Sequence, residues 1–323
     1  MKGGPASDAA PVIARGLVKR YGELAAVDHV DLTVERGDVY GYLGPNGAGK
    51  TTSLRMLLGL IRPTEGSAQL FGRDPLLDGA RALDGVAGFV EAPRFYPYLS
   101  GRRNLELLAA FDRGNARERI GEVLDAVDLS DRAGDRVGGY SHGMRQRLGI
   151  AASLLRRPQL LLLDEPNTGL DPAGMRDMKA LLRRLAAEGI TVLLSSHQMA
   201  DVEEMCNRVA IIDRGRILFE GDTAELIRST GTWYHLRTSD RARARELGTR
   251  LGIADIEDEG EELRFTADEP TVERYIAELA VAGIGVRALV PAQATLEQLF
   301  FQLTESHAPA SPAEPRDLQE AVP

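Results

Sequence analysis

The stretch that decides the fold of this chain is VYGYLGPNGAGKTT, residues 39–52. Its first five residues are mostly apolar and predict a short buried strand. Residues 44–51 then match the spacing G-x-x-x-x-G-K-T, and leucines at helical spacing follow until Pro63. A glycine-rich loop between a strand and a helix presents backbone N–H groups and the positive helix end to an anion. Residues 44–51 therefore predict a phosphate-binding loop.

The residue types within this loop indicate that it binds a nucleoside triphosphate with its metal ion. We expect Lys50 to reach the β- and γ-phosphates and the Thr51 hydroxyl to hold Mg²⁺. The other interpretation is a glycine-rich turn with a solvated lysine, and the flanking strand and helix argue against it. The predicted cofactors are ATP and Mg²⁺, and the predicted binding residues of this loop are Asn46, Gly47, Gly49, Lys50, Thr51 and Thr52.

A second signal is the run of four leucines at 160–163, which ends in Asp164 and Glu165. Ligands of open α/β sheets lie at the carboxyl ends of the strands, so these carboxylates are expected beside the phosphate loop. We expect Asp164 to face Mg²⁺, and Glu165 to orient and deprotonate the attacking water. Taken alone the pattern could be a polar strand end, and the phosphate loop favours the catalytic interpretation.

The segment YSHGMRQ, residues 140–146, resembles the signature segment of ABC ATPases, which usually reads LSGGQ. It departs from that pattern at His142 and Met144. The resemblance implies that Ser141 and the Gly143 N–H contact the γ-phosphate held by a second subunit. An ordinary helix cap is the alternative for this segment alone. The resemblance spans about residues 12–230, and it implies a head-to-tail homodimer with ATP sandwiched between the subunits.

Further positions match the same family. The resemblance implies that Asp171, in a Gly-Leu-Asp segment, belongs to the loop that crosses the dimer interface. It makes His197, which follows the apolar run 191–194, the histidine that contacts the γ-phosphate and helps to hold the water. It makes Tyr21 the aromatic side chain that stacks on adenine. His197 could instead be a structural histidine at a strand end, and Tyr21 an ordinary surface tyrosine.

Glu91 stands where the family usually has a glutamine, and its carboxylate could supply an oxygen to Mg²⁺. The segment 91–99 resembles the branch of exporters that confer resistance to antibiotics and bacteriocins. Its aromatic residues Phe95, Tyr96 and Tyr98 are either core residues or a socket for a membrane partner.

The chain is long enough for about two domains. We predict a disordered leader (1–11), an ABC ATPase domain (12–230) with a helical subdomain at about 92–158, an accessory domain (231–304) and a disordered tail (305–323). The accessory domain has the order β-α-β-β-α-β, which is typical of the ferredoxin-like fold. The predicted fold class is therefore an α/β P-loop NTPase core with an antiparallel β subdomain and an α-helical subdomain, followed by a small α+β domain.

Composition limits the partners. The net charge of −9 disfavours nucleic acid, and no apolar run is long enough to span a bilayer. The single cysteine, Cys206, excludes an intrachain disulfide and favours a reducing compartment. The resemblance implies a cytoplasmic ATPase subunit, peripheral on the cell membrane, that drives export through separate integral-membrane permease subunits. The alternatives are an importer ATPase with a regulatory C-terminal domain, and an ABC ATPase that acts on nucleic acid or ribosomes.

Overall fold

The computed structural model describes residues 9–112, 114–229, 232–253, 256–293 and 295–306. The strands are β1 (Val12–Tyr21), β2 (Leu24–Val34), β3 (Val39–Leu43), β4 (Glu65–Leu70), β5 (Val86–Phe89), β6 (Leu160–Leu163), β7 (Thr191–Ser196), β8 (Arg208–Asp213), β9 (Arg216–Asp222), β10 (Thr232–Thr238), β11 (Glu257–Glu259), β12 (Glu262–Thr266) and β13 (Val286–Gln293). The helices are α1 (Lys50–Leu57), α2 (Gly101–Ala109), α3 (Ile120–Ala126), α4 (His142–Leu154), α5 (Pro172–Ala187), α6 (Met199–Met205), α7 (Thr223–Ser229), α8 (Arg241–Arg250), α9 (Glu269–Val281) and α10 (Leu296–Ser306). Short 3-10 helices occupy Gly79–Arg81, Ala116–Arg119, Ser130–Arg132 and Val137–Gly139.

The central sheet has the strand order β5-β6-β7-β3-β8-β9. Its strands are parallel except β9, which pairs antiparallel with β8. Strand β6 is buried at every residue, as its four leucines predict. Because β6, β7 and β3 are neighbours and run in the same direction, the loops after them emerge at the same edge of the sheet. This edge carries the phosphate loop, Asp164, Glu165 and His197.

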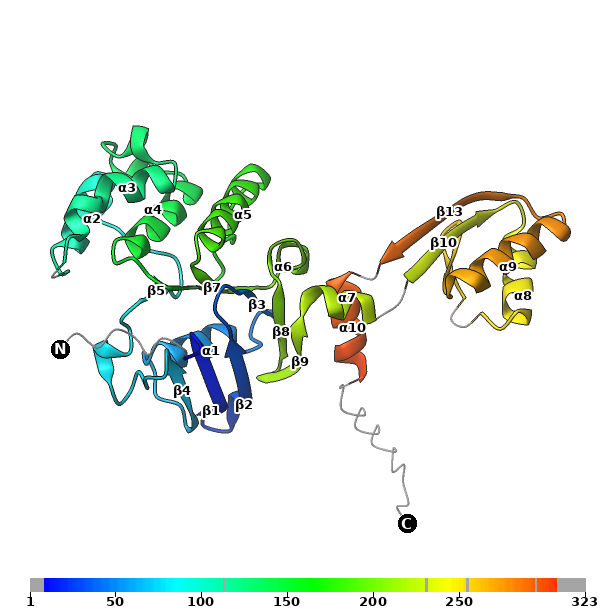
Figure 1. Cartoon of the computed structure of the whole chain (residues 1–323), viewed down its shortest axis with the longest axis horizontal. Coiled ribbons are helices and arrows are strands. Elements are labelled where there is room, and N and C mark those ends of the chain that lie inside the picture. Colours follow the sequence, from blue (N-terminus) through cyan, green and yellow to red (C-terminus); the bar gives the residue numbers. More distant parts are fainter. Residues whose placement is uncertain (1–8, 113, 230–231, 254–255, 294, 307–323) are drawn as a thin grey trace, which may run out of the picture.

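A separate antiparallel sheet has the order β2-β1-β4 (Figure 1). Its strands share one core with helix α1 and with strands of the central sheet. Helix α1 begins after Gly49, whose φ of 107° lies in the left-handed region. A Cβ at this position would lie 2.4 Å from the carbonyl oxygen of Ala26, so the loop and β2 can approach this closely only at a glycine. Leu54 and Leu57 then anchor α1 in the core between the sheets.

Helices α2, α3 and α4 form the predicted helical subdomain (Figure 1). Leu105, Leu124 and Leu148, one from each helix, are fully buried in a common core with β6 and β7. Helix α4 therefore connects the signature segment at its start with the central sheet along its length.

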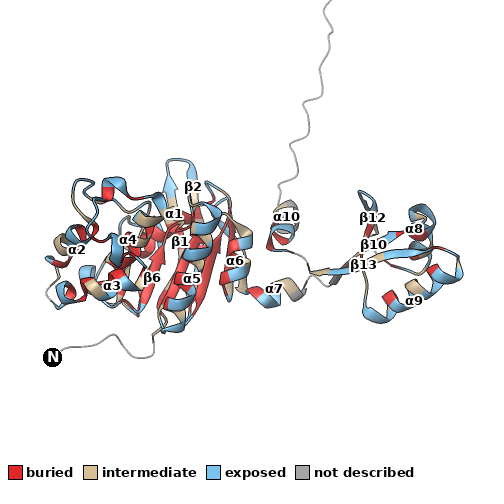
Figure 2. Ribbon diagram, turned by 90° about the horizontal axis from the view of Figure 1, so that it is seen from above, coloured by how far each residue is buried: buried red, intermediate tan, exposed pale blue. Residues whose placement is uncertain are grey.

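Strands β10 to β13 form a sheet of order β11-β12-β10-β13. Helices α8 and α9 contribute to its core, in which Phe265 and Tyr275 make an edge-to-face contact with ring centroids 5.5 Å apart. The order of the elements along the chain and the order of the strands in the sheet match the ferredoxin-like arrangement. The predicted fold class is confirmed. This unit forms a separate lobe beside the ATPase core (Figures 1 and 2).

The last helix leaves this lobe and returns to the core. Leu296, Leu299 and Phe300 of α10 are buried in the cluster that includes Val202 and Met205 of α6. The Leu296 N–H donates to the Glu203 carboxylate over 3.1 Å. The predicted accessory domain of residues 231–304 thus includes a helix that packs on the ATPase core.

The predicted domain boundaries stay predictions. Residues 1–8 of the predicted leader and 307–323 of the predicted tail lie outside the described residues, whereas residues 305 and 306 end α10. Cys206 is buried, and burial raises the pKa of its thiol to about 12. Within the described residues, no helix combines the length and the apolar character needed to cross a membrane.

Candidate functional site

Lys50 begins helix α1 directly after the glycines of the phosphate loop and is only 5% exposed. Its ammonium group donates to the carbonyl oxygens of Gly44 (2.7 Å) and Pro45 (3.1 Å), and it lies 3.1 Å from Glu165 Oε1. An ammonium group has three donors, and in this structure each of them has an acceptor. A phosphate group that binds Lys50 must therefore replace at least one of these contacts.

Glu165 is held from several sides. Its Oε2 lies 2.5 Å from His197 Nδ1 and accepts from the Thr168 hydroxyl over 2.7 Å. Its φ of 48° is left-handed, which is uncommon for a residue with a Cβ and is found at functional sites. The structure thus brings together Lys50, Glu165 and His197, which come from three separate loops at the sheet edge.

The electrostatic surroundings keep Glu165 ionised. Burial would raise the pKa of Glu165, but the Thr168 hydrogen bond, the charge of Lys50 and the His197 contact outweigh it and hold this pKa below its usual value. An ionised carboxylate can accept a proton from water. This is the chemistry expected of a general base.

Asp164 is 7% exposed and lies next to the start of α1. Its Oδ2 accepts from the Thr51 hydroxyl over 2.8 Å, and its Oδ1 accepts from Ser195 over 2.5 Å. Hydroxyl and carboxylate oxygens are ligands that Mg²⁺ prefers, so Thr51 and Asp164 fit this ion. Ser195, which follows the apolar part of β7, has no role predicted from the sequence.

The signature segment forms a second half-site. Ser141 caps α4 by accepting from the Met144 N–H over 3.2 Å, and Asp171 caps α5 by accepting from the Gly174 N–H over 2.9 Å. Ser141, Gly143 and Asp171 line a hollow of about 480 Å³. The family roles of these residues stay predictions, and their joint position at one hollow is a fact of the structure.

The remaining predicted residues lie at the borders of the site. Tyr21 ends β1 and is 52% exposed, with the Lys19 ammonium 5.2 Å from its ring centroid. Its face is accessible to a planar ring, as adenine stacking requires. Asn46 and Gly47 are exposed in the phosphate loop, and Thr52 is half-buried on α1.

Glu91 is 59% exposed and pairs with Arg55 near the end of α1. The structure thus connects this residue to the phosphate-loop helix through an arginine. Its predicted role as a metal ligand stays a prediction.

Comparisons with known proteins agree with this geometry. The ABC transporter family pattern matches residues 27–168. The chain is 42% identical over 229 residues to the bacitracin transport ATP-binding protein BcrA of Bacillus licheniformis, covering 71% of this chain and 75% of that protein. It is 39% identical over 319 residues to the daunorubicin/doxorubicin resistance ATP-binding protein DrrA of Streptomyces peucetius, covering 95% and 94%. The chain belongs to the ATP-binding subunits of ABC transporters.

Solved structures of ABC ATPases share this fold. A structure of an ATP-binding subunit of an ABC transporter superposes with a TM-score of 0.60 at 27% identity, covering 68% of this chain and 92% of that one. A dimeric post-hydrolysis cassette bound to ADP and Pi superposes with a TM-score of 0.59 at 26% identity, covering 66% and 98%. As an ABC ATPase the chain binds and hydrolyses ATP. The resemblance to the antibiotic-resistance branch is confirmed by the similarity to BcrA and DrrA.

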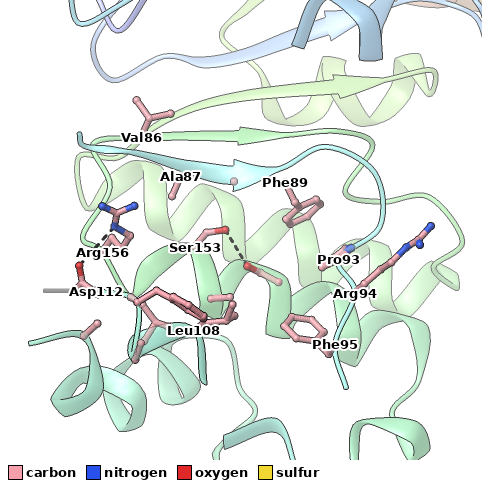
Figure 3. A pocket seen from close by; sticks show the side chains of 17 residues that line it. Val86, Ala87, Phe89, Pro93, Arg94, Phe95, Leu108, Asp112, Ser153 and Arg156 are labelled. Atoms are coloured by element: carbon pink, nitrogen blue, oxygen red, sulfur yellow. Dashed lines mark hydrogen bonds and ion pairs between the residues drawn. The ribbon is translucent and has the colours of Figure 1, made fainter. Parts of the chain in front are cut away.

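This ABC ATPase also has a cavity of about 430 Å³ between β5 and the helical subdomain (Figure 3). Phe89, Pro93 and Phe95 line one end of this cavity, and Leu108 of α2 also lines the cavity. Arg156 and Asp112, 3.8 Å apart, border the other end. Tyr96 and Tyr98 are exposed beyond the cavity, so of the predicted aromatic group only Phe95 lines it.

Proposed function

We propose that this chain is the motor of an exporter and works as a head-to-tail homodimer. One observation carries this proposal. Lys50 is held by its own loop and by Glu165, whereas Ser141 caps a different helix and lines a hollow to which Lys50 does not contribute. A second copy, turned by a two-fold axis, would place its Ser141 and Gly143 N–H against the γ-phosphate on Lys50 of the first. The similar cassette that was solved as a dimer with ADP and Pi supports the proposal of a dimer.

The proposed reaction follows from the roles of the residues. The phosphate-loop N–H groups and Lys50 bind the triphosphate, and Tyr21 stacks on the base. Thr51 and Asp164 would hold Mg²⁺, which neutralises charge on the β- and γ-phosphates; Glu91 is a further candidate ligand. Glu165 takes a proton from water while the water oxygen attacks the γ-phosphorus, and the bond to ADP breaks. His197 positions the water and the γ-phosphate, and Asp171 lies at the dimer interface. Loss of the γ-phosphate removes the partner's contacts, and the pair opens.

The proposed partner is an integral-membrane permease, with this chain on its cytoplasmic face. The cavity beside β5 is lined mostly by apolar residues, and its lining residues Phe89 and Pro93 lie on either side of Glu91 in the sequence. A short helix of the permease seated there could therefore transmit its position to the site. The relatives are named for bacitracin transport and for resistance to daunorubicin and doxorubicin. We therefore propose an antibiotic or a drug as the cargo.

Two variants test the chemistry. Glu165→Gln should bind ATP and lose turnover, because its amide cannot accept the proton from water. Lys50→Ala should weaken nucleotide binding, because the loop loses its charge. ATP hydrolysis by Glu165→Gln at the wild-type rate would refute the assignment of the base.

Co-purification of the membrane partner tests the transport role. The expected result is a permease whose presence makes ATPase activity respond to candidate drugs. Association with a solute-binding protein would favour the importer alternative. Association with ribosomes or nucleic acid would favour the non-transport alternative.

A further inference from the structure

The Ser195 hydroxyl contacts both residues of the Asp164–Glu165 pair. Ser195 lies at the end of β7 and is fully buried. It donates a hydrogen bond to Asp164 Oδ1 over 2.5 Å and accepts one from the Glu165 N–H over 2.9 Å. A hydroxyl buried in an apolar strand is costly to bury unless it is bonded, and this one uses both its donor and an acceptor position.

We propose that Ser195 is a positioning residue for ATP hydrolysis, which orients the Asp164 carboxylate toward the metal ion and fixes the backbone that carries Glu165. This inference rests on the proposed roles of Asp164 and Glu165. The strand register explains why this position is suited to the task. Leu163 of β6 is paired with Leu194 of β7, so the next residue along each segment, Asp164 directly after β6 and Ser195 within β7, lies beside the other.

The orientation of Asp164 follows from its partners. Thr51 bonds Oδ2 and Ser195 bonds Oδ1, while the Asp164 N–H donates to the Phe89 carbonyl over 3.0 Å. With each oxygen bonded from a different side, rotation of the carboxylate breaks a hydrogen bond. Partners that orient a metal ligand in this way contribute to metal affinity because the ligand pays less to become ordered.

The second contact acts on Glu165. Its left-handed φ of 48° is unfavourable for a residue with a Cβ, so neighbouring contacts must hold it. The Ser195 Oγ accepts the N–H of this residue and so holds the peptide that precedes the strained torsion. The direction of the Glu165 side chain, toward Lys50 and His197, depends on that peptide.

The test compares three variants of the full-length chain. Ser195→Ala removes both hydrogen bonds, and Ser195→Thr keeps a hydroxyl on a β-branched residue that suits a strand. Ser196→Ala is the matched control, because Ser196 is the next residue of β7 and its hydroxyl bonds the backbone of Gln198. Circular dichroism melts establish that each variant is folded before it is compared.

Two readouts are needed. The first is the Mg²⁺ concentration at half-maximal ATPase rate. The second is the binding of Mn²⁺, as a stand-in for Mg²⁺, to the chain with ADP by electron paramagnetic resonance, which requires no turnover. Ser195→Ala should raise both half-saturation concentrations by about 10- to 100-fold, whereas Ser196→Ala should leave them at the wild-type values. Ser195→Thr should restore most of the loss.

Equal Mn²⁺ binding by wild type and Ser195→Ala would overturn the inference. So would equal shifts in Ser195→Ala and Ser196→Ala, or a folded Ser195→Thr that behaves like Ser195→Ala. A wild-type chain without ATPase activity would instead count against the proposed function, so the two failures can be told apart.

Discussion

The contact between Lys50 and Glu165 leads to an unusual expectation for Glu165→Gln. In the structure the Lys50 ammonium group is shared between two carbonyl oxygens and this carboxylate. A nucleotide phosphate must displace the carboxylate or a carbonyl oxygen to reach Lys50. Replacing the carboxylate with an amide should therefore destabilise the nucleotide-free chain and tighten nucleotide binding.

The magnitude follows from the contact. A hydrogen bond to a charged group contributes about 1.5–3 kcal/mol. The Glu165 side chain is 22% exposed, and glutamine still offers a neutral oxygen, so we expect a loss of about 1 kcal/mol. This corresponds to a fall in Tm of about 2–4 °C for a domain of this size. If the whole loss appears as a gain in binding, the affinity for nucleotide rises about 5-fold.

The assay is calorimetric binding of ADP, with EDTA present to prevent metal binding, together with a thermal melt of the nucleotide-free chain. ADP is used because it lacks the γ-phosphate that would draw two copies together. Glu273→Gln, an exposed change on α9, controls for net charge. If Glu165 acted on ADP only by repulsion, binding would tighten without a fall in Tm. An unchanged Tm would therefore show that the contact between Glu165 and Lys50 does not stabilise the nucleotide-free chain.

Three further results are expected. Gly49→Ala should abolish nucleotide binding and lower the Tm, because its Cβ would meet the Ala26 carbonyl at 2.4 Å with φ at 107°; filter binding of labelled ATP and a melt measure both. Because the pKa of Glu165 is lower in the folded chain than its usual value of 4.5, ionised Glu165 stabilises the fold at pH values above 4.5. This stabilisation is lost as the pH falls through the pKa of Glu165 in the folded chain. The Tm difference between wild type and Glu165→Gln should therefore be present at pH 7 and vanish under acidic conditions. Leu299→Ala, at a residue 4% exposed, should lower the free energy of unfolding of the ATPase core by about 2–5 kcal/mol, whereas Leu263→Ala should destabilise the ferredoxin-like lobe. Urea unfolding with limited proteolysis would distinguish the two effects. If Leu299→Ala destabilised both parts equally, the packing of α10 on the ATPase core would be contradicted.

The ATPase fold could be predicted from sequence because its signals are local. The phosphate loop combines glycines, a lysine and a threonine at fixed spacing, between a strand and a helix. The run of leucines before Asp164 is typical of a buried strand or helix segment. The two carboxylates that follow the run place its end at the edge of the sheet where ligands bind. These patterns need no knowledge of distant contacts.

Other features depend on packing between distant segments. The sequence does not predict strand β4, because its residues EGSAQL lack a run of β-branched residues and form a strand only by pairing with β1. The interaction of α10 with α6 joins residues 93 positions apart. The ion pair between Glu91 and Arg55 and the position of Ser195 likewise depend on the finished sheet edge. The polar residues that directly follow the apolar part of β7 were the signal available for Ser195.

Sharing of each ATP by two copies of this chain defines the proposed homodimer. Light scattering of Glu165→Gln with ATP and Mg²⁺ tests it most directly, in the presence and absence of a second change, Ser141→Arg, with bound ATP measured in the same samples. The expected result is a dimer for Glu165→Gln, and ATP-loaded monomers once Ser141→Arg is added. A Glu165→Gln chain that stays monomeric when saturated with ATP, or a dimer that Ser141→Arg does not disturb, would show that two copies do not share ATP through Ser141.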